Sequence, residues 1–192
     1  MKTILSTRGY KISKRYITNK QIELIKKDLI INPYTFDMTG FNDKSKEEDN
    51  SYNIYSESDK YYTVPRYWGI SNFGPPVENR IPSGLDINVE FKGEMRDYQQ
   101  DIVKKYMKVV GDQGGSLVCL KTGGGKTVVA LYIISLLKKK TIVLCHKSFL
   151  MDQWIERIRQ FLPGVKITKV QGNISDWSGQ IVLAMVQTVL NR

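Results

Sequence analysis

Apolar residues in the second half of the chain form short runs that alternate with longer helical stretches. Four short runs are typical of buried strands: residues 116–120, 141–145, 165–170 and 179–186. The stretch before the first run and the stretches after the first and second runs place apolar side chains at helical spacing or in a longer apolar run: residues 95–107, 126–137 and 149–162. This alternation predicts an α/β fold with a mostly parallel sheet, because parallel strands need helical crossovers.

The first ninety residues carry a weaker pattern, and we expect them to form a small accessory α+β region. Residues 3–17 alternate polar and apolar positions loosely, which predicts a hairpin or a single strand. Residues 20–30 carry apolar side chains at helical spacing, and Asn19 is placed to cap that helix.

An acidic segment that is poor in aliphatic residues interrupts this region at residues 37–60, where we expect a flexible loop. Its end overlaps residues 52–69, whose pattern predicts two short strands joined by a turn at Ser56-Glu-Ser-Asp59. The expected organisation is therefore an accessory region over residues 1–90, followed by an α/β domain over residues 91–192.

Charge is distributed in blocks. The formal net charge of +10 is the sum of +6 over residues 1–31, −4 over 32–60, −1 over 61–90 and +9 over 91–192. Basic blocks favour a polyanionic partner, and nucleic acid is the first candidate. A generally lysine-rich composition is the alternative explanation.

Two groups of side chains within the accessory region are candidates for nucleic-acid contact. The first group is basic and could contact phosphates, although a solvated surface is the more frequent explanation for such a group. It comprises Lys11, Lys14, Arg15, Lys20, Lys26 and Lys27. The second group is suited to base stacking, although a small accessory core is the favoured interpretation; it comprises Tyr61, Tyr62, Arg66, Tyr67, Trp68 and Phe73.

Cys119 and Cys145, the two cysteines, lie in predicted buried strands, and we expect reduced core residues of an intracellular protein. One histidine and two cysteines disfavour a structural metal site. No secretory signal is visible, and the apolar run at residues 128–137 is too short to span a bilayer. We therefore expect no membrane partner.

The most informative stretch is Lys121-Thr-Gly-Gly-Gly-Lys-Thr127, between a predicted strand and a predicted helix. Its glycines let backbone N–H groups curl around a phosphate, and the helix N-terminus adds further donors. Lys126 is placed to reach the β- and γ-phosphates of ATP, and the Thr127 hydroxyl to hold Mg²⁺. The candidate nucleotide ligands are Lys121, Thr122, Gly123, Gly124, Gly125, Lys126 and Thr127. An ordinary glycine-rich turn is the alternative.

Two residues on the helix before this loop are candidates for contact with the base. Arg96 and Gln99 precede the phosphate loop by about 25 residues. A glutamine amide donates and accepts hydrogen bonds at once, which matches the N6 and N7 edge of adenine. This pair of residues indicates contact with adenine only because a phosphate loop follows it.

Polar residues follow the last three predicted strands directly. Ligands bind at the carboxyl ends of strands in open α/β sheets, and such an edge suits a single strand of nucleic acid. The candidates are His146, Lys147, Ser148, Gln171, Gly172, Gln187 and Thr188. For His146, packing or a phosphate contact is preferred over a role as catalytic base.

At these residues the chain resembles superfamily 2 DNA helicases of the XPB-like kind, in particular those of nucleocytoplasmic large DNA viruses. That group includes giant-virus members and the poxvirus transcript-release helicase. The resemblance covers residues from about 52 to 192. Leu120 replaces the first glycine of the general phosphate-loop pattern, as is usual in this superfamily, and Met95 replaces a leucine. Five segments are similar to motifs Q, I, Ia, Ib and Ic: residues 95–99, 120–127, 146–158, 170–172 and 184–188.

The resemblance implies a RecA-like P-loop domain that uses ATP and Mg²⁺ for 3′–5′ translocation on DNA. It implies that Gln99 reads adenine, that Lys126 and Thr127 bind phosphate and Mg²⁺, and that the strand-end residues touch the DNA backbone. A viral source would place the protein in the host cytoplasm, a virus factory or the virion.

One departure limits what the resemblance implies. The family needs an Asp-Glu pair after an apolar strand to hold Mg²⁺ and position water, but the acids after Thr127 are Asp152, Glu156 and Asp176. We therefore expect the N-terminal part of a helicase, or one piece of a split gene, that does not hydrolyse ATP alone. The alternatives are a non-catalytic nucleic-acid-binding module with a vestigial P-loop and a different P-loop enzyme, such as a kinase.

Overall fold

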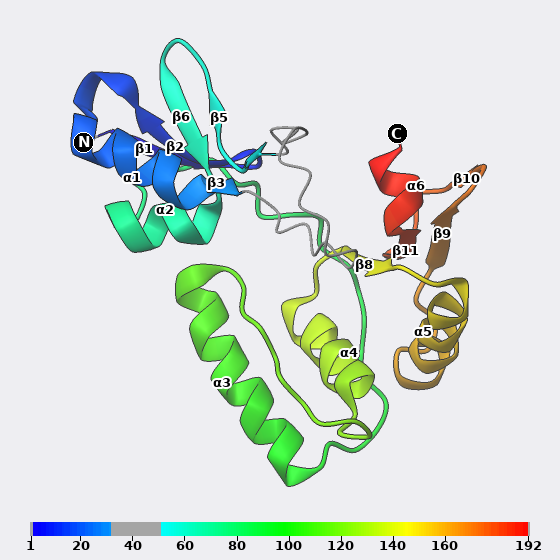
Figure 1. Ribbon diagram of the computed structural model, residues 1–192. Helices are drawn as coiled ribbons and strands as arrows, with labels where there is room; N and C mark the ends of the chain where they lie inside the picture. Colours follow the sequence, from blue (N-terminus) through cyan, green and yellow to red (C-terminus); the bar gives the residue numbers. More distant parts are fainter. Residues whose placement is uncertain (1, 32–50, 192) are drawn as a thin grey trace, which may run out of the picture. The chain divides into compact units, whose positions relative to one another are not determined.

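The computed structural model describes residues 2–31 and 51–191 (Figure 1). The chain separates into two compact units, Met1–Ser83 and Gly84–Arg192. Each unit has a hydrophobic core of its own.

A five-stranded sheet with the order β5-β6-β2-β1-β7 forms the centre of the first unit. Its strands are β1 (Thr3–Ser6), β2 (Gly9–Ser13), β5 (Ser56–Glu57), β6 (Tyr61–Val64) and β7 (Glu78–Asn79). Strands β1 and β2 are antiparallel with Thr3 opposite Ile12, and β7 runs parallel to β1. Of the two structures predicted for residues 3–17, a hairpin or a single strand, the hairpin is therefore confirmed. A 3-10 turn, Lys14–Tyr16, follows it.

Two helices, α1 (Asn19–Leu29) and α2 (Arg66–Phe73), cover one face of this sheet. Ile25 and Leu29 of α1 are buried in the same cluster as Tyr10, Ile12 and Tyr62 of the strands. A short ladder of β3 (Ile30–Ile31) and β4 (Tyr52–Asn53) follows α1.

The structure corrects three details predicted for this unit. Thr18, not Asn19, caps α1, and Gln21 completes a capping box with it. Ser56 and Glu57 pair as strand β5 instead of forming the predicted turn, which lies at residues 58–60. Residues 37–50 of the expected loop lie outside the described residues, and residues 52–53 and 56–57 are strands.

The aromatic side chains of the first unit divide between core and surface. Tyr62 is buried, and Trp68 and Phe73 pack against the same cluster. For these three residues the accessory-core interpretation is confirmed. Tyr67 is 49% exposed, with the guanidinium carbon of Arg66 5.6 Å from its ring centroid.

The second unit contains a four-stranded sheet with the order β10-β9-β11-β8. Strands β8 (Thr141–Cys145), β9 (Ile167–Gln171) and β11 (Ile181–Met185) are parallel, and β10 (Ile174–Ser175) is antiparallel to β9. Its helices are α3 (Asp97–Gln113), α4 (Lys126–Leu137), α5 (Ser148–Phe161) and α6 (Val186–Leu190). The predicted, mostly parallel α/β arrangement is confirmed, although β10 and α6 were not foreseen.

Strand β11 lies at the centre of the second unit, and side chains on both of its faces are buried. Ile181 and Leu183 cluster with Leu131 of α4 and with Met151 and Ile158 of α5. Val182 and Ala184 point to the other face and cluster with Val170 of β9. This burial explains why β11 is almost entirely apolar.

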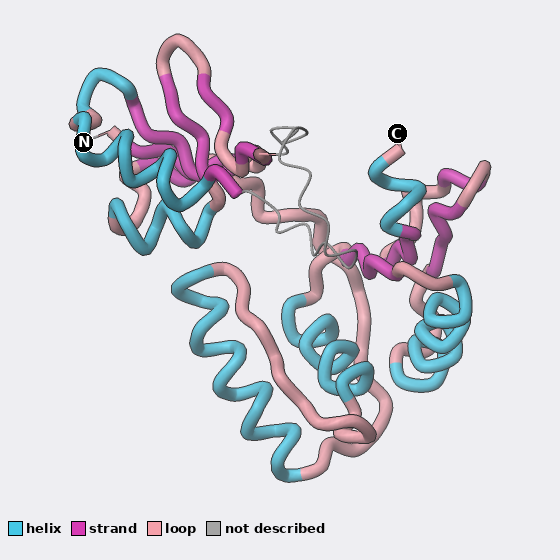
Figure 2. Tube along the Cα trace, viewed as in Figure 1, coloured by secondary structure: helices cyan, strands magenta, loops and turns pink. Residues whose placement is uncertain are grey.

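The strand predicted at residues 116–120 is wrong. Residues 115–120 belong to no strand, and Figure 2 shows the connection from α3 to α4 as loop. Leu117 is 86% exposed and Cys119 is exposed, whereas Cys145 is buried as expected. An apolar run becomes a strand only when a neighbour takes up its backbone hydrogen bonds, and the described sheet ends at β8 without pairing to this segment.

Candidate nucleotide and nucleic-acid site

The phosphate loop forms a tight turn that leads directly into α4. Gly123 and Gly125 have φ values of 76° and 79°, which side-chain-bearing residues rarely adopt. Gly125 is the N-cap of α4, and its carbonyl accepts the Val129 N–H at 3.0 Å. The N–H groups of the first helical turn lack partners within the helix, so they are available to an anion.

The start of α3 holds the loop from one side. Gln99 is 4% exposed, its Oε1 accepts the Arg96 backbone N–H at 3.0 Å, and its Nε2 donates to the Gly124 carbonyl at 3.1 Å. The Tyr98 hydroxyl donates to the same carbonyl at 3.2 Å. The structure thus brings the predicted Gln99 to the loop, where it contacts the loop backbone.

Lys126 lies across the loop, and its Nζ donates to the Lys121 carbonyl at 3.0 Å. Its side chain is exposed, so a phosphate can compete for the ammonium group. Thr127 is half-buried at the second position of α4. These positions suit the roles predicted for Lys126 and Thr127.

The residues around the loop fit Mg²⁺ only in part. Thr127 supplies a hydroxyl oxygen, but the sequence has no Asp or Glu between Asp112 and Asp152. Mg²⁺ in nucleotide sites is held by phosphates and one or two carboxylates. Among the described residues, no three His, Cys, Asp or Glu side chains gather into a group that could hold a metal. The loop therefore offers a phosphate-bound Mg²⁺ the Thr127 hydroxyl but no carboxylate.

Three strand ends meet at one edge of the second sheet. Cys145 of β8 pairs in register with Met185 of β11, and Ala184 of β11 with Val170 of β9. The residues that follow these strands are therefore level with one another. The structure brings together the seven strand-end candidates: His146, Lys147, Ser148, Gln171, Gly172, Gln187 and Thr188.

Hydrogen bonds connect these strand ends. The Gln187 amide donates to the His146 carbonyl at 3.2 Å, and the Gly172 N–H donates to the Thr188 hydroxyl at 3.1 Å. His146, Lys147 and Ser148 are exposed. At the start of α5, where Lys147 is the N-cap, no described side chain caps the helix. Backbone donors and a lysine therefore face solvent together, as binding to a phosphate backbone requires.

Sequence reasoning missed two parts of this arrangement. The first is the Tyr98 hydroxyl, next to Gln99 in sequence, which contacts the Gly124 carbonyl. Gln187 and Thr188 belong to the short helix α6, which begins at Val186 directly after β11. The apolar pattern of the sequence predicts neither the contact of the Tyr98 hydroxyl nor helix α6.

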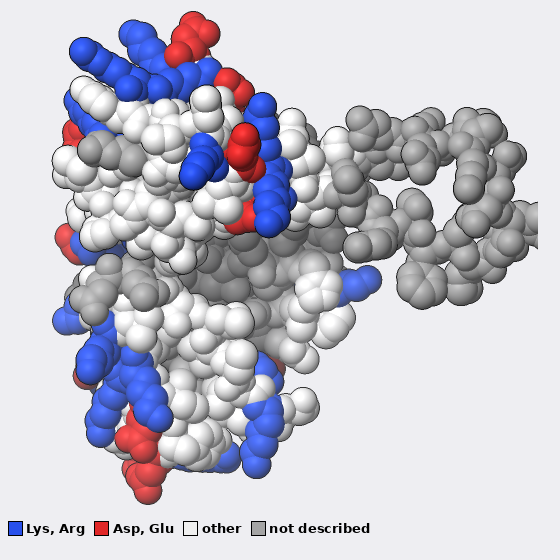
Figure 3. Space-filling view, turned by 60° about the vertical axis from the view of Figure 1, so that its left-hand side comes forward, with Lys and Arg blue, Asp and Glu red and all other residues white. Residues whose placement is uncertain are grey.

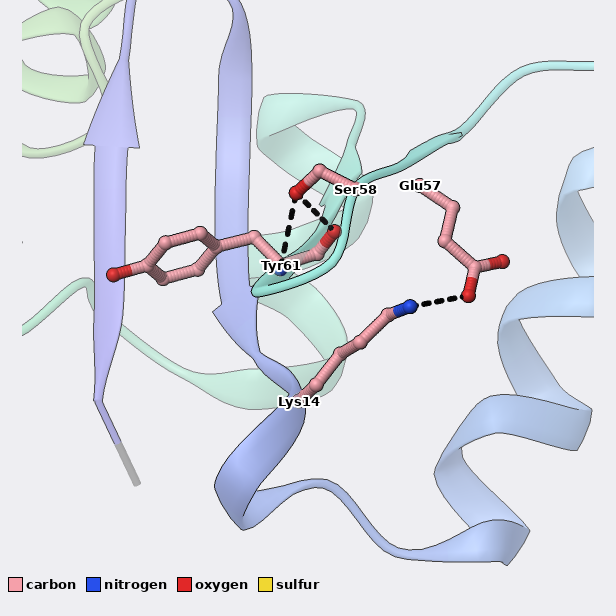
Figure 4. Close-up of polar contacts among 4 residues, drawn as sticks. All are labelled: Lys14, Glu57, Ser58 and Tyr61. Atoms are coloured by element: carbon pink, nitrogen blue, oxygen red, sulfur yellow. Dashed lines mark hydrogen bonds and ion pairs between the residues drawn. The ribbon is translucent and has the colours of Figure 1, made fainter.

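On the face drawn in Figure 3, Lys and Arg side chains cover more of the surface than Asp and Glu. One candidate cation of the first unit is already paired, because Lys14 Nζ lies 2.5 Å from Glu57 Oε1 (Figure 4). The hydrogen bond from Lys14 lowers the pKa of Glu57, and the same bond raises the pKa of Lys14. Lys14 Nζ also lies 5.1 Å from the centroid of the Tyr62 ring. These contacts favour a structural role for Lys14.

The chain is similar to several known proteins. Residues 92–192 match the family described as Type III restriction enzyme, res subunit. A protein of Acanthamoeba polyphaga mimivirus, named as an ATP-dependent RNA helicase, is 30% identical over 192 residues. That alignment covers 98% of this chain and 36% of the mimivirus protein.

Two further proteins are similar to the chain. The DNA 3′–5′ translocase XPB2 of Sulfurisphaera tokodaii is 39% identical over 110 residues, which cover 55% of this chain and 24% of that protein. The UvsW helicase from bacteriophage T4 has a similar fold, with a TM-score of 0.56 at 14% identity, over 100% of this chain and 77% of that chain. The expected RecA-like α/β fold is thereby confirmed.

The chain spans about a third of the length of the mimivirus relative. No helix in the described part of the chain is both long and apolar enough to cross a bilayer.

Proposed function

The chain belongs to the family of the Type III restriction enzyme res subunit, and we propose that it is the ATP-binding N-terminal part of an ATP-dependent superfamily 2 helicase. The observation that carries this proposal is the phosphate loop, where Gly123 and Gly125 adopt positive φ and Lys126 opens α4. Residues 91–192 would form the first part of the first RecA-like domain, together with residues 84–90, which belong to the same unit, and the first unit would be an accessory region.

In this proposal ATP binds at the loop with its phosphates on the N-terminus of α4. Lys126 exchanges its bond to the Lys121 carbonyl for the β- and γ-phosphates, and Thr127 contributes its hydroxyl to Mg²⁺. Bound Mg²⁺ neutralises phosphate charge. Lys121, Thr122 and residues 123–125 supply the backbone of the cradle, while Arg96 lies at its rim.

The strand-end edge is the proposed nucleic-acid interface. His146, Lys147 and Ser148 would meet phosphates at the start of α5, with Gln171, Gly172, Gln187 and Thr188 beside them. DNA is the preferred substrate because the residues resemble XPB-like DNA translocases of viral type, and the similar archaeal protein is named as a DNA translocase. The mimivirus relative is named as an RNA helicase, so competition between DNA and RNA tests this choice.

The first test measures ATP binding to the 192-residue chain by calorimetry. Lys126→Ala should weaken binding at least about tenfold, because a hydrogen bond to a charged group contributes about 1.5–3 kcal/mol. Lys108→Ala, which removes an exposed lysine of α3, is the matched control and should leave binding unchanged. Equal affinities for wild type and Lys126→Ala would favour the alternative, a nucleic-acid-binding module with a vestigial P-loop.

The second test measures binding of labelled single-stranded DNA by fluorescence anisotropy over a range of salt concentrations. Affinity should fall steeply with salt, and Lys147→Ala should weaken binding and reduce the slope by about one contact. Lys108→Ala again serves as the control. Binding that does not depend on salt would exclude the proposed interface and favour a P-loop enzyme that acts on small molecules.

A further inference from the structure

Phe149 is an exposed aromatic residue beside the proposed nucleic-acid interface. It is the second residue of α5 and follows Lys147, the N-cap, and Ser148. Its exposed fraction is 58%, whereas every other phenylalanine in the described part of the chain is partly buried. The ring of Phe149 is therefore accessible to a ligand.

The geometry of the helix turns Phe149 away from the hydrophobic core. Each residue advances about 100° around an α-helix, so Met151 and Ile158 lie about 200° and 180° around the helix from Phe149. Met151 and Ile158 are the buried residues of α5. Gln153 and Glu156, on the same side of the helix as Phe149, are exposed. Phe149 is thus an apolar side chain on the polar face of α5, where packing against the core does not account for it.

The position of Phe149 within α5 directs its ring toward the strand-end edge. Side chains on a helix lean toward its N-terminus, and α5 begins directly after β8. His146, Lys147 and Ser148, which connect the end of β8 to Phe149, are exposed. An aromatic ring therefore lies next to groups that can bind a phosphate, as the base of a nucleotide lies next to its own phosphate.

Negative charge is absent from the segments that form this edge. They contain no Asp or Glu: residues 145–151, 170–175 and 184–191. Asp152, the first acid after Phe149 on α5, is paired with Lys169 at 3.3 Å. A polyanion that approaches the first turn of α5 therefore encounters no unpaired carboxylate there, and its bases can come close to the ring.

An aromatic ring beside phosphate-binding groups is suited to stacking on a base. Proteins that bind single strands combine a basic surface with aromatic side chains on which bases stack, and every base has a π-face. A phenylalanine ring has no hydrogen-bonding group. Phe149 can therefore add affinity for a base without selecting one base over another.

We propose that Phe149 stacks on a nucleobase of the single strand whose phosphates bind at His146, Lys147 and Ser148. This inference rests on the proposed function, in which the strand-end edge binds nucleic acid. It adds a contact with a base to an interface that otherwise consists of groups for the phosphate backbone.

The experiment measures binding of the 192-residue chain to two labelled DNA strands of equal length by fluorescence anisotropy. One strand carries bases and the other is abasic, so both have the same number of phosphates. Phe149→Ala should weaken binding to the base-bearing strand about five- to hundredfold, as expected for the loss of one stacked base. Binding to the abasic strand should not change, and the salt dependence should stay that of wild type, because no phosphate contact is lost.

Three further variants show whether the aromatic ring is responsible. Phe149→Tyr keeps the ring and should bind the base-bearing strand as wild type does. Phe149→Leu keeps an apolar side chain without a ring and should weaken that binding as alanine does. Leu144→Ala, which removes an apolar side chain that is 60% exposed near the end of β8, should leave both affinities unchanged. The melting temperature of each variant verifies folding, and Phe149→Leu decides the matter if Phe149→Ala does not fold.

Two results would overturn the inference. A Phe149→Ala chain that binds the base-bearing strand as tightly as wild type would show that no base contacts the ring, as expected if another protein segment covers Phe149. Equal weakening for the base-bearing and abasic strands would show that the substitution disturbs the phosphate-binding groups and removes no contact with a base.

The outcomes also separate this inference from the proposed function. If wild type binds the base-bearing strand with a steep salt dependence and Lys147→Ala weakens that binding, the proposed interface stands whatever Phe149→Ala does. If wild type binds neither strand, the proposed interface and the stacking contact fail together.

Discussion

At the scale of single residues, two glycines of the phosphate loop share a backbone conformation but differ in their surroundings. Gly123 and Gly125 have φ values of 76° and 79°. A Cβ at Gly123 would have no described atom within 4 Å, whereas one at Gly125 would meet Gln99. The conformation explains why each is glycine, and the packing makes Gly125 the more sensitive position.

Gly125→Ala should therefore reduce stability and ATP affinity more than Gly123→Ala. Both alanines carry the cost of a left-handed conformation, about 1–2 kcal/mol, and only Gly125→Ala displaces Gln99. Chemical denaturation measures the free energy of unfolding, and calorimetry measures ATP affinity. Equal effects of the two substitutions would contradict the packing of Gln99 against the loop.

The two cysteines also differ in their surroundings. Cys119 is exposed and Cys145 is buried, and burial raises the pKa of the Cys145 thiol. Because the thiolate is the reactive form, a thiol reagent should modify one cysteine rapidly in the native chain and two in denaturant. Cys119→Ser should remove the rapid reaction. Rapid loss of two thiols from the native chain would contradict the burial of Cys145.

At the scale of elements, helix α1 shows how a neighbouring residue takes over a predicted role. Asn19 is a good N-cap by composition, but Thr18 has the extended backbone, with φ −91° and ψ 158°, and accepts the Gln21 N–H. Gln21 returns the contact by accepting the Thr18 N–H at 3.0 Å. This reciprocal pair satisfies two backbone donors at once.

Thr18→Ala should lower the free energy of unfolding by about 1 kcal/mol, the usual contribution of an N-cap side chain. Asn19→Ala is the matched control and should change stability little, since Asn19 is the first residue inside the helix. Urea denaturation followed by circular dichroism compares the two variants. A larger loss of unfolding free energy for Asn19→Ala than for Thr18→Ala would favour Asn19 as the N-cap.

At the scale of the whole molecule, the chain carries a phosphate loop without the acidic pair that the resemblance to superfamily 2 helicases implies for hydrolysis. The acids after Thr127 are Asp152, Glu156 and Asp176. Asp152 pairs with Lys169 at 3.3 Å, and Asp176 accepts hydrogen bonds from Ser178, which lower its pKa. Both therefore have structural partners on the surface of the second unit.

We accordingly predict that the 192-residue chain binds ATP without hydrolysing it at a useful rate, even with Mg²⁺ and DNA present. Phosphate release followed over time is the measurement, with Lys126→Ala as the blank for contaminating enzymes. Steady release by the wild type that Lys126→Ala abolishes would contradict the prediction. Such a result would require a carboxylate from within this chain to position the attacking water.

The parts of this protein that depend on local chemistry can be predicted from its amino-acid sequence. The phosphate loop, the helix that starts at Lys126, and the order of strands and helices from residue 126 to 185, apart from the short strand β10, follow from glycine conformation and apolar periodicity. Family membership was also apparent, because those motifs occur in order at specific spacing.

Which groups contact one another depends on the tertiary fold. Residues 116–120 have the composition of a strand, yet they form none, because a strand requires a partner as well as a pattern. Gln99 has the chemistry of an adenine reader, yet it binds the Gly124 carbonyl, because folding places α3 beside the loop. The direction of a side-chain amide and the pairing of a backbone depend on neighbours distant in sequence, and a local pattern contains no information about them.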